Sequence, residues 1–130
     1  SFEGMQWLGG RNCQILQPDV AWQTGILRWM VVLQIESERE QWWIDLTTGR
    51  FVSENWQMPA GAIVQFPAPM QSLIPLEQLE ARLQLSIQST APEIACLLAG
   101  VAVELLTVDH EWQSGQLRLH TGLEFMPDLF

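Results

Sequence analysis

Apolar residues in the first half of the chain fall into short runs that favour β-strands. The run at 26–35 is rich in β-branched, aromatic and other apolar residues, and a second run follows at 41–46, after the charged segment 36–40. The sequence Thr-Thr-Gly at 47–49 is a turn signal, because glycine adopts positive φ without steric cost. A further extended stretch begins at 50–52. This order of runs and turns predicts antiparallel strands.

A proline-rich segment then changes the pattern. Four prolines fall within residues 59–75, and each removes a backbone donor, so we predict a connector with at most a short strand at 62–66. The connector separates a strand-rich part, 1–58, from a part with a helix and a C-terminal hairpin, 76–130. Neither part has many core residues of its own, so we expect one domain crossed by a long loop.

The residues after Pro75 have helical periodicity. Proline fits the start of a helix, and four apolar residues follow at spacings of three and four. This face consists of Leu76, Leu79, Leu83 and Ile87. Residues 83–88 also alternate with a period of two, which is typical of a strand. We therefore predict a helix to about Arg82 and leave 83–88 open.

A second helix start is indicated by Thr90, whose side chain could cap a helix while Glu93 reaches back. A helix at 94–106 competes with a strand at 101–108, and Gly100 would allow the one to stop and the other to start. The predicted fold is α+β: an antiparallel β-sheet or small open barrel built from hairpins, with one or two helices packed on it.

One internal similarity stands out. Residues 22–28, WQTGILR, match residues 112–118, WQSGQLR, at five of seven positions, and a sixth exchanges Thr for Ser. The two segments lie 90 residues apart. Duplication or shared hairpin chemistry can produce such a match, and so can chance in a chain rich in Gln, Trp and Leu.

The similarity suggests two hairpins with Thr24-Gly25 and Ser114-Gly115 at their tips. Counting outward, a Trp would face a Leu in each hairpin, and Glu111 would face Arg118. In the second hairpin Asp109 would face His120.

Composition limits the classes of function. The chain has 130 residues, is 48% hydrophobic and 16% charged, and can form a core without metal or disulfide. A formal charge of −9 with six bases, all arginine, argues against nucleic-acid binding and against docking on an anionic membrane. The absence of lysine excludes Schiff-base and P-loop chemistry. Acidity favours solubility or a basic partner surface.

Targeting signals and cysteine spacing bear on the cellular compartment of the protein. No apolar run is long enough to span a bilayer, and residues 1–4 do not begin a signal peptide. Cys13 and Cys96 are far apart, so we expect two buried free thiols in a reducing compartment. These features predict a cytoplasmic protein.

Candidate chemistry is sparse. Asp109 and His120 form a possible polar pair that could serve as a general base, although a structural cross-strand pair explains it more simply. His110 and His120 would point to opposite faces, so we predict no metal site, and we predict no cofactor. No serine lies in a nucleophile motif. We assign no catalytic residue.

Seven tryptophans exceed what a core of this size usually holds. Trp42 and Trp43 are adjacent, so in a strand they face opposite sides and one of them needs a cover. Together with Trp29 and Trp56 they are the candidate interface. The first hypothesis is a non-catalytic interaction or assembly domain that binds a protein partner or itself. The alternatives are a module binding a small ligand or saccharide on a Trp-lined sheet face, and a small hydrolase or lyase.

Overall fold

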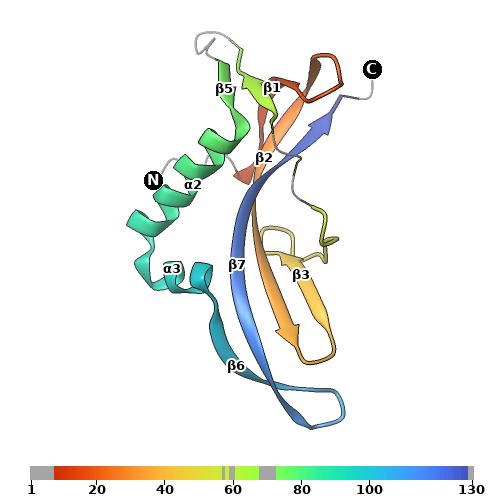
Figure 1. The fold of residues 1–130 in the computed structure, drawn as a ribbon, viewed down its shortest axis with the longest axis vertical. Helices are drawn as coiled ribbons and strands as arrows, with labels where there is room; N and C mark the ends of the chain where they lie inside the picture. Colours follow the sequence, from red (N-terminus) through yellow and green to blue (C-terminus); the bar gives the residue numbers. More distant parts are fainter. Residues whose placement is uncertain (1–7, 57, 59–60, 68–72, 129–130) are drawn as a thin grey trace.

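The computed structural model describes residues 8–56, 58, 61–67 and 73–128, which form an open antiparallel sheet with two helices (Figure 1). The predicted α+β class is confirmed, and the sheet does not close into a barrel. The strands are β1 (Arg11–Leu16), β2 (Gln23–Ser37), β3 (Gln41–Asp45), β4 (Ile63–Gln65), β5 (Leu73–Pro75), β6 (Val101–Leu106) and β7 (Trp112–Pro127). The helices are α2 (Leu76–Thr90) and α3 (Pro92–Ala99).

Two long strands form the centre of the sheet. β2 pairs with β7 from Gly25↔Pro127 to Ser37↔Gly115. The other edge of β2 is shared, because its first part pairs with β1 and its last part with β3. The path across the sheet is β5-β4-β1-β2-β7-β6. The sheet therefore has a β1–β4 end and a β3–β6 end, joined by the β2–β7 ladder.

The two hairpins of this path have the same register when residue numbers are shifted by 90. Arg11↔Leu27 in β1–β2 corresponds to Val101↔Leu117 in β6–β7. The β2–β7 register maps onto itself under the same shift, with the pair Val31↔Thr121 at its centre. Because 90 is an even number, equivalent side chains point to the same face of the sheet.

This arrangement corrects the predicted hairpin tips. Thr24-Gly25 and Ser114-Gly115 lie inside β2 and β7, and the chain reverses at 17–22 and 107–111 instead. The expected pairing of Trp112 with Leu117 is therefore wrong, as is that of Glu111 with Arg118, since Trp112 faces Leu106. Gly25 and Gly115 instead allow β2 and β7 to approach each other closely. A Cβ on Gly25 would collide with the carbonyl oxygen of Met126, and one on Gly115 with that of Glu36, the residue equivalent to Met126.

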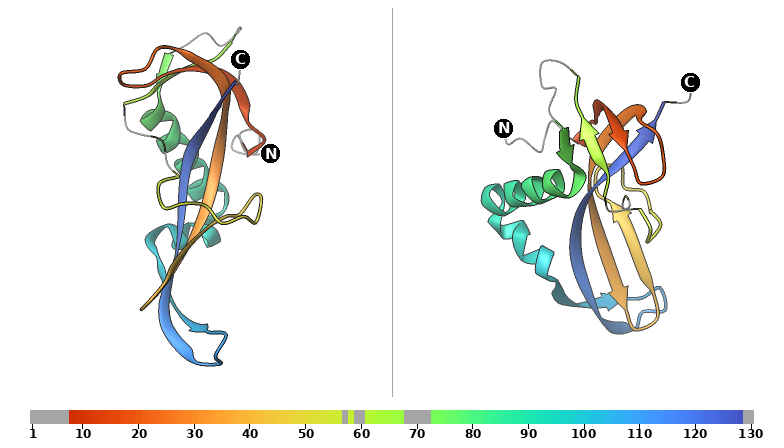
Figure 2. Two further views of the ribbon diagram at one scale, coloured as in Figure 1. Left: turned by 90° about the vertical axis from the view of Figure 1, so that its right-hand side faces the viewer. Right: turned by 45° about the horizontal axis from the view of Figure 1, so that its top comes forward.

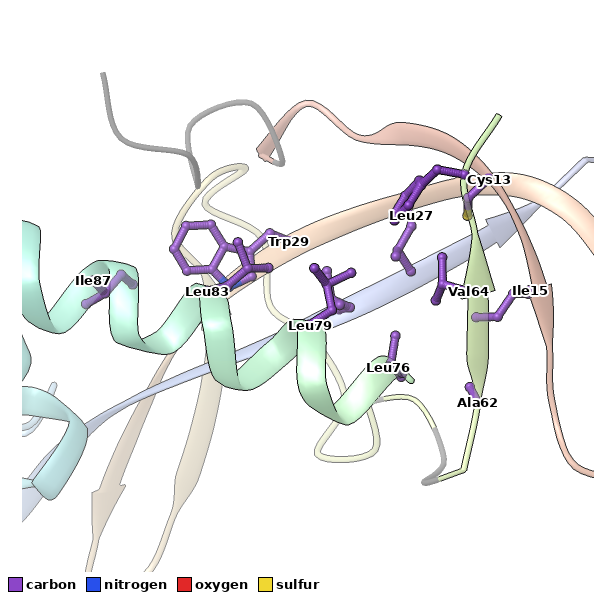
Figure 3. Packing of buried hydrophobic residues seen from close by; sticks show 12 residues of the cluster. Cys13, Ile15, Leu27, Trp29, Ala62, Val64, Leu76, Leu79, Leu83 and Ile87 are labelled. Atoms are coloured by element: carbon purple, nitrogen blue, oxygen red, sulfur yellow. The ribbon is translucent and has the colours of Figure 1, made fainter. Parts of the chain in front are cut away.

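The core lies between the β1–β4 end of the sheet and helix α2. Leu27 and Trp29 of β2 point toward the helix (Figure 3), and Leu123 of β7, which pairs with Trp29, belongs to the same cluster. We call this side of the sheet, which carries the odd-numbered residues of β2 and β7, the helix face. Leu79 and Leu83 of α2 point toward Trp29 and Leu27. All five side chains are at most 1% exposed, so this part of the helix face is closed.

Helix α2 continues through the segment that the sequence left open. Leu83 and Ile87 are both buried against the sheet, so the helical face extends through 83–88 and overrides the local alternation. Thr90 is the last residue of α2, and Ala91 occupies the N-cap position of α3, which begins with Pro92, so the helix start predicted at Thr90 is one residue too early. At Gly100, with φ of 97°, the helix stops and β6 starts. The predicted short strand within 62–66 is also confirmed as β4.

Helix α2 also covers part of the edge of β7. The Glu80 carboxylate accepts a hydrogen bond of 3.3 Å from the backbone N–H of Leu123. Burial raises the pKa of Glu80, and the nearby charge of Glu77 adds to this increase, while the Leu123 N–H opposes it. A side chain here takes the place that a neighbouring strand would otherwise occupy.

The opposite face of the sheet carries a buried ion pair. The Arg28 guanidinium lies 3.0 Å from the carboxylate of Asp45, which is 2% exposed, and 3.4 Å from that of Glu124. Burial of Asp45 opposes its charged form, but hydrogen bonds from Arg28 and the Thr47 N–H lower its pKa overall. The ion pair ties β3 to β2 and β7.

After Asp45, at the end of β3, the chain forms the predicted turn at 47–49. The turn leads to a single bridge between Ile44 and Phe51, where the sequence predicted a longer extended stretch.

Replacing either strand glycine should destabilise the protein. We expect Gly25→Ala and Gly115→Ala each to lower the free energy of unfolding by about 1–3 kcal/mol, because the added methyl group forces the β2–β7 ladder apart. Urea unfolding monitored by circular dichroism measures the change. Gly9→Ala is the control, because a Cβ there has open space. Wild-type stability in both strand variants would contradict the close approach.

The Asp45 carboxylate should give a pH-dependent contribution to stability. We expect Asp45→Asn to lower the free energy of unfolding at pH 7 by about 1–3 kcal/mol, because Arg28 loses a charged acceptor. The pKa of Asp45 is below its ordinary value of 3.8, so its contribution is complete above that value and is lost as the pH falls through the lower one. The stability difference between wild type and variant should therefore shrink in acid. Glu40→Gln, in an exposed turn, should show no such difference.

Candidate functional site

The tryptophans occupy different environments. Trp29 is 1% exposed and belongs to the core, so it cannot form part of an interface. Trp42 and Trp43 face opposite sides of β3, as predicted, since they pair with Ile35 and Gln34 of β2. Trp42 is 37% exposed, whereas Trp43 is half-buried with its ring 4.9 Å from that of His120. Trp56 is half-buried beside Gln17, Gln23 and Phe125.

The exposed side of Trp42 belongs to a larger apolar surface. On the helix face, at the β3–β6 end, strand register places six apolar side chains next to one another. We call this surface the open apolar face, and it consists of Leu33, Ile35, Trp42, Val103, Leu105 and Leu117. All six are half-buried or exposed. Figure 2 shows α2 beside the β1–β4 end of the sheet, with the tips of the β2–β3 and β6–β7 hairpins projecting beyond both helices.

The equivalent positions at the other end provide an internal comparison. Four of the six side chains have counterparts, 90 residues away, that are at most 3% exposed. The half-buried side chains and their buried counterparts are Val103 and Cys13, Leu105 and Ile15, Leu117 and Leu27, and Leu33 and Leu123. Ile35 and its counterpart Phe125 are half-buried at both ends. The difference is the cover, because β4 and α2 close the β1–β4 end and no described element closes the other.

A groove of about 380 Å³ runs along this surface at the tips of the two hairpins. Ile35, Trp42 and Leu105 contribute apolar walls. Its charged lining residues are Glu40, Asp109 and Glu111, with Arg39 as the one base among them. The groove therefore combines apolar walls with polar side chains, and its exposed charged rim is acidic on balance.

The predicted pair of Asp109 and His120 does not form. His120 lies opposite Val32 within β7, whereas Asp109 belongs to the connection between β6 and β7. A ring nitrogen of His120 lies 2.8 Å from Oε1 of Gln34. Burial, helped by the charge of Arg118, lowers the pKa of His120. The histidine thus has structural partners on the face opposite the open apolar face.

Neither cysteine has the surroundings of a nucleophile. Both are free, but only Cys13 is buried, so the expectation that both thiols are buried is wrong for Cys96. Burial raises the pKa of Cys13 to about 11, and the Leu27 backbone only partly offsets this. The Cys96 Sγ lies 3.2 Å from the Glu93 carbonyl oxygen. Within the described ranges no three His, Cys, Asp or Glu side chains gather to hold a metal ion.

Comparison with known proteins adds no assignment. No family model, curated protein or solved structure shows a significant match to this chain. Among the described residues, no helix has the length and apolar character needed to cross a membrane. The site must therefore be interpreted from its own chemistry.

Sequence reasoning found Trp42 but missed the aliphatic residues around it. A signal was present, since Val101, Val103 and Leu105 alternate with Ala102 and Glu104. Alternation indicates that one side of a strand is apolar. It does not indicate whether the chain itself supplies the layer that covers that side.

Lysine substitutions at equivalent positions in the two ends of the sheet should distinguish an open surface from a closed core. We expect Leu105→Lys to change the free energy of unfolding by less than about 1 kcal/mol, because the lysine can extend into water. We expect its counterpart Ile15→Lys to cost more than about 4 kcal/mol or to prevent folding, because it buries an unpaired charge. Chemical denaturation of the two variants makes the comparison. Equal losses would mean that Leu105 lies in a closed core.

Proposed function

We propose that this chain is a non-catalytic protein-interaction or assembly domain that binds through the open apolar face. The observation that carries the proposal is the contrast between equivalent positions, such as Ile15 at 0% exposure and the half-buried Leu105. Soluble monomers rarely leave large contiguous apolar patches in water, and such patches mark sites of interaction. A partner on this face would remove it from solvent, as β4 and α2 do at the other end.

Three further features support binding rather than catalysis. His120 bonds to Gln34, the pKa of Cys13 is raised, and Asp109 lies in a connection away from His120. The surface itself is aliphatic and aromatic, with acids at its rim. This chemistry suits the burial of a protein surface, where the apolar centre supplies most of the free energy and the polar rim selects the partner.

We also propose that the two hairpins are copies of one structural unit. The matching register and the matching packing of Gly25 and Gly115 support this interpretation. On this view both copies keep an apolar face toward the same side. In the β1–β2 copy this face is covered by β4 and α2, and in the β6–β7 copy it is available to a partner.

The proposal can be tested without knowing the partner. We expect the isolated chain to bind the apolar dye ANS, or else to associate with itself as its concentration rises from about 1 to 100 µM. In the isolated chain, this apolar face is either exposed to water, where it binds the dye, or covered by a second copy. Fluorescence titration and sedimentation velocity measure the two outcomes. Substitution Leu117→Gln should weaken whichever is observed, whereas the exposed Gln116→Ala on the opposite face should not.

A strictly monomeric chain that does not bind the dye would contradict this function. It would mean that the chain covers the face itself. Circular dichroism of both variants establishes that they are folded before they are compared.

A further inference from the structure

The outer edge of β6 is a second feature of the open end for which the described strands supply no partner. At the β1–β4 end, β1 pairs with β2 on one side and with β4 on the other. At the equivalent place β6 pairs with β7 on one side, and no described strand pairs with its other side. An edge strand presents unpaired backbone N–H and C=O groups, which can accept another extended segment.

The chain itself contains an example of the segment that fits such an edge. β4 runs antiparallel to β1, and its Val64 lies opposite Ile15. Both side chains are 0% exposed, and Ala62 and Phe66 on the same side of the segment are each 2% exposed. Leu105 is the residue equivalent to Ile15. An antiparallel segment on β6 would therefore place an apolar side chain against Leu105 and others at alternate positions.

The groove beside this strand indicates what else the segment carries, with Asp109 and Glu111 from the β6–β7 connection and Arg39 and Glu40 from the β2–β3 connection. The groove that contains Leu105 has Glu40, Asp109 and Glu111 at its rim against Arg39 alone. All four charged side chains are exposed. A segment with Lys or Arg at its ends would be attracted to this rim, whereas a second copy of this chain, with its formal charge of −9, would be repelled.

We propose that the β6 edge binds an extended segment of another protein, antiparallel to β6, apolar at alternate positions and basic at its ends. The proposal rests on the proposed function and names the kind of partner for the same surface. Main-chain hydrogen bonds to β6 supply affinity, Val103 and Leu105 at the β6 side of the open apolar face select alternate apolar side chains, and the acidic rim selects the flanking bases.

A pair of synthetic peptides tests the charge and the strand pattern together. The probe carries Ala-Ile-Val-Gln-Phe, the sequence of residues 62–66, between two lysines at each end. The control has glutamates in place of these lysines. We expect the lysine peptide to bind at least about fivefold more tightly at low salt in fluorescence anisotropy, and the difference to shrink as salt screens the rim.

Variants of the protein locate the binding surface. Leu105→Gln should weaken binding of the lysine peptide at least about fivefold, because it removes an apolar contact without changing the charge. Ala102→Gln is the matched control, because Ala102 lies on the same strand, is exposed and points to the opposite face. Glu111→Gln should reduce both the affinity and its salt dependence. Hydrogen exchange should show slower exchange in β6 when the peptide is bound.

Several outcomes would overturn the inference. They are equal affinity for the two peptides, equal binding by the Leu105→Gln variant, and protection of another strand in place of β6. Self-association of the chain without peptide binding would identify a second copy as the occupant, and the proposed function would stand. Failure of peptide binding in a monomer that still binds ANS would likewise overturn only this inference.

Discussion

The pairing of β2 with β7 is the constraint on which the rest of the structure depends. These strands are far apart in sequence, yet their ladder extends from Gly25↔Pro127 to Ser37↔Gly115 and joins the two ends of the sheet. Each end of the ladder needs a glycine, because a Cβ on Gly25 or Gly115 would meet backbone of the other strand. Contacts of such long sequence separation are entropically costly to form, so this ladder determines the topology and not merely the local structure.

Because the register repeats with an even shift, equivalent apolar side chains lie on the same face at both ends of the sheet. The helix face is apolar at both ends, but the described residues cover only the β1–β4 end. The connector brings β4 to the edge of β1, and α2 then crosses the β1–β4 end with Leu79 and Leu83. At the other end α3 leads directly through Gly100 into β6, and no element of the described ranges covers the open apolar face. The asymmetry of the connections, rather than any difference between the strands, leaves the second apolar face open.

On the opposite face of the sheet, side chains of the chain itself contact one another. The ion pair of Arg28 with Asp45 and Glu124 joins three strands there, and Trp43, Gln34 and His120 contact one another. These partners stabilise β3 against β2 and keep the exposed hairpins in place. The open apolar face is thus built on strands that side-chain contacts hold together, so the face itself has less conformational entropy to lose when a partner binds.

Much of the local structure was determined by the sequence itself. Apolar runs, the glycine turn at 47–49, the helix start after Pro75 and the opposite orientation of Trp42 and Trp43 follow from short-range sterics and periodicity. The match between 22–28 and 112–118 identified equivalent segments but not their place within strands. Thr-Gly and Ser-Gly are weak turn signals, and only the pairing of β2 with β7 decided that Gly25 and Gly115 lie inside a ladder.

The tertiary structure alone decided which apolar residues are covered. Trp29 lies under α2 while Trp42 remains partly in water, and Ile15 is buried while Leu105 is not. Periodicity reports which side of a strand is apolar, because it depends on neighbours along the chain. Burial depends on which distant segment packs on that side. Here β4 and α2 pack at the β1–β4 end, and no described segment packs on the open apolar face.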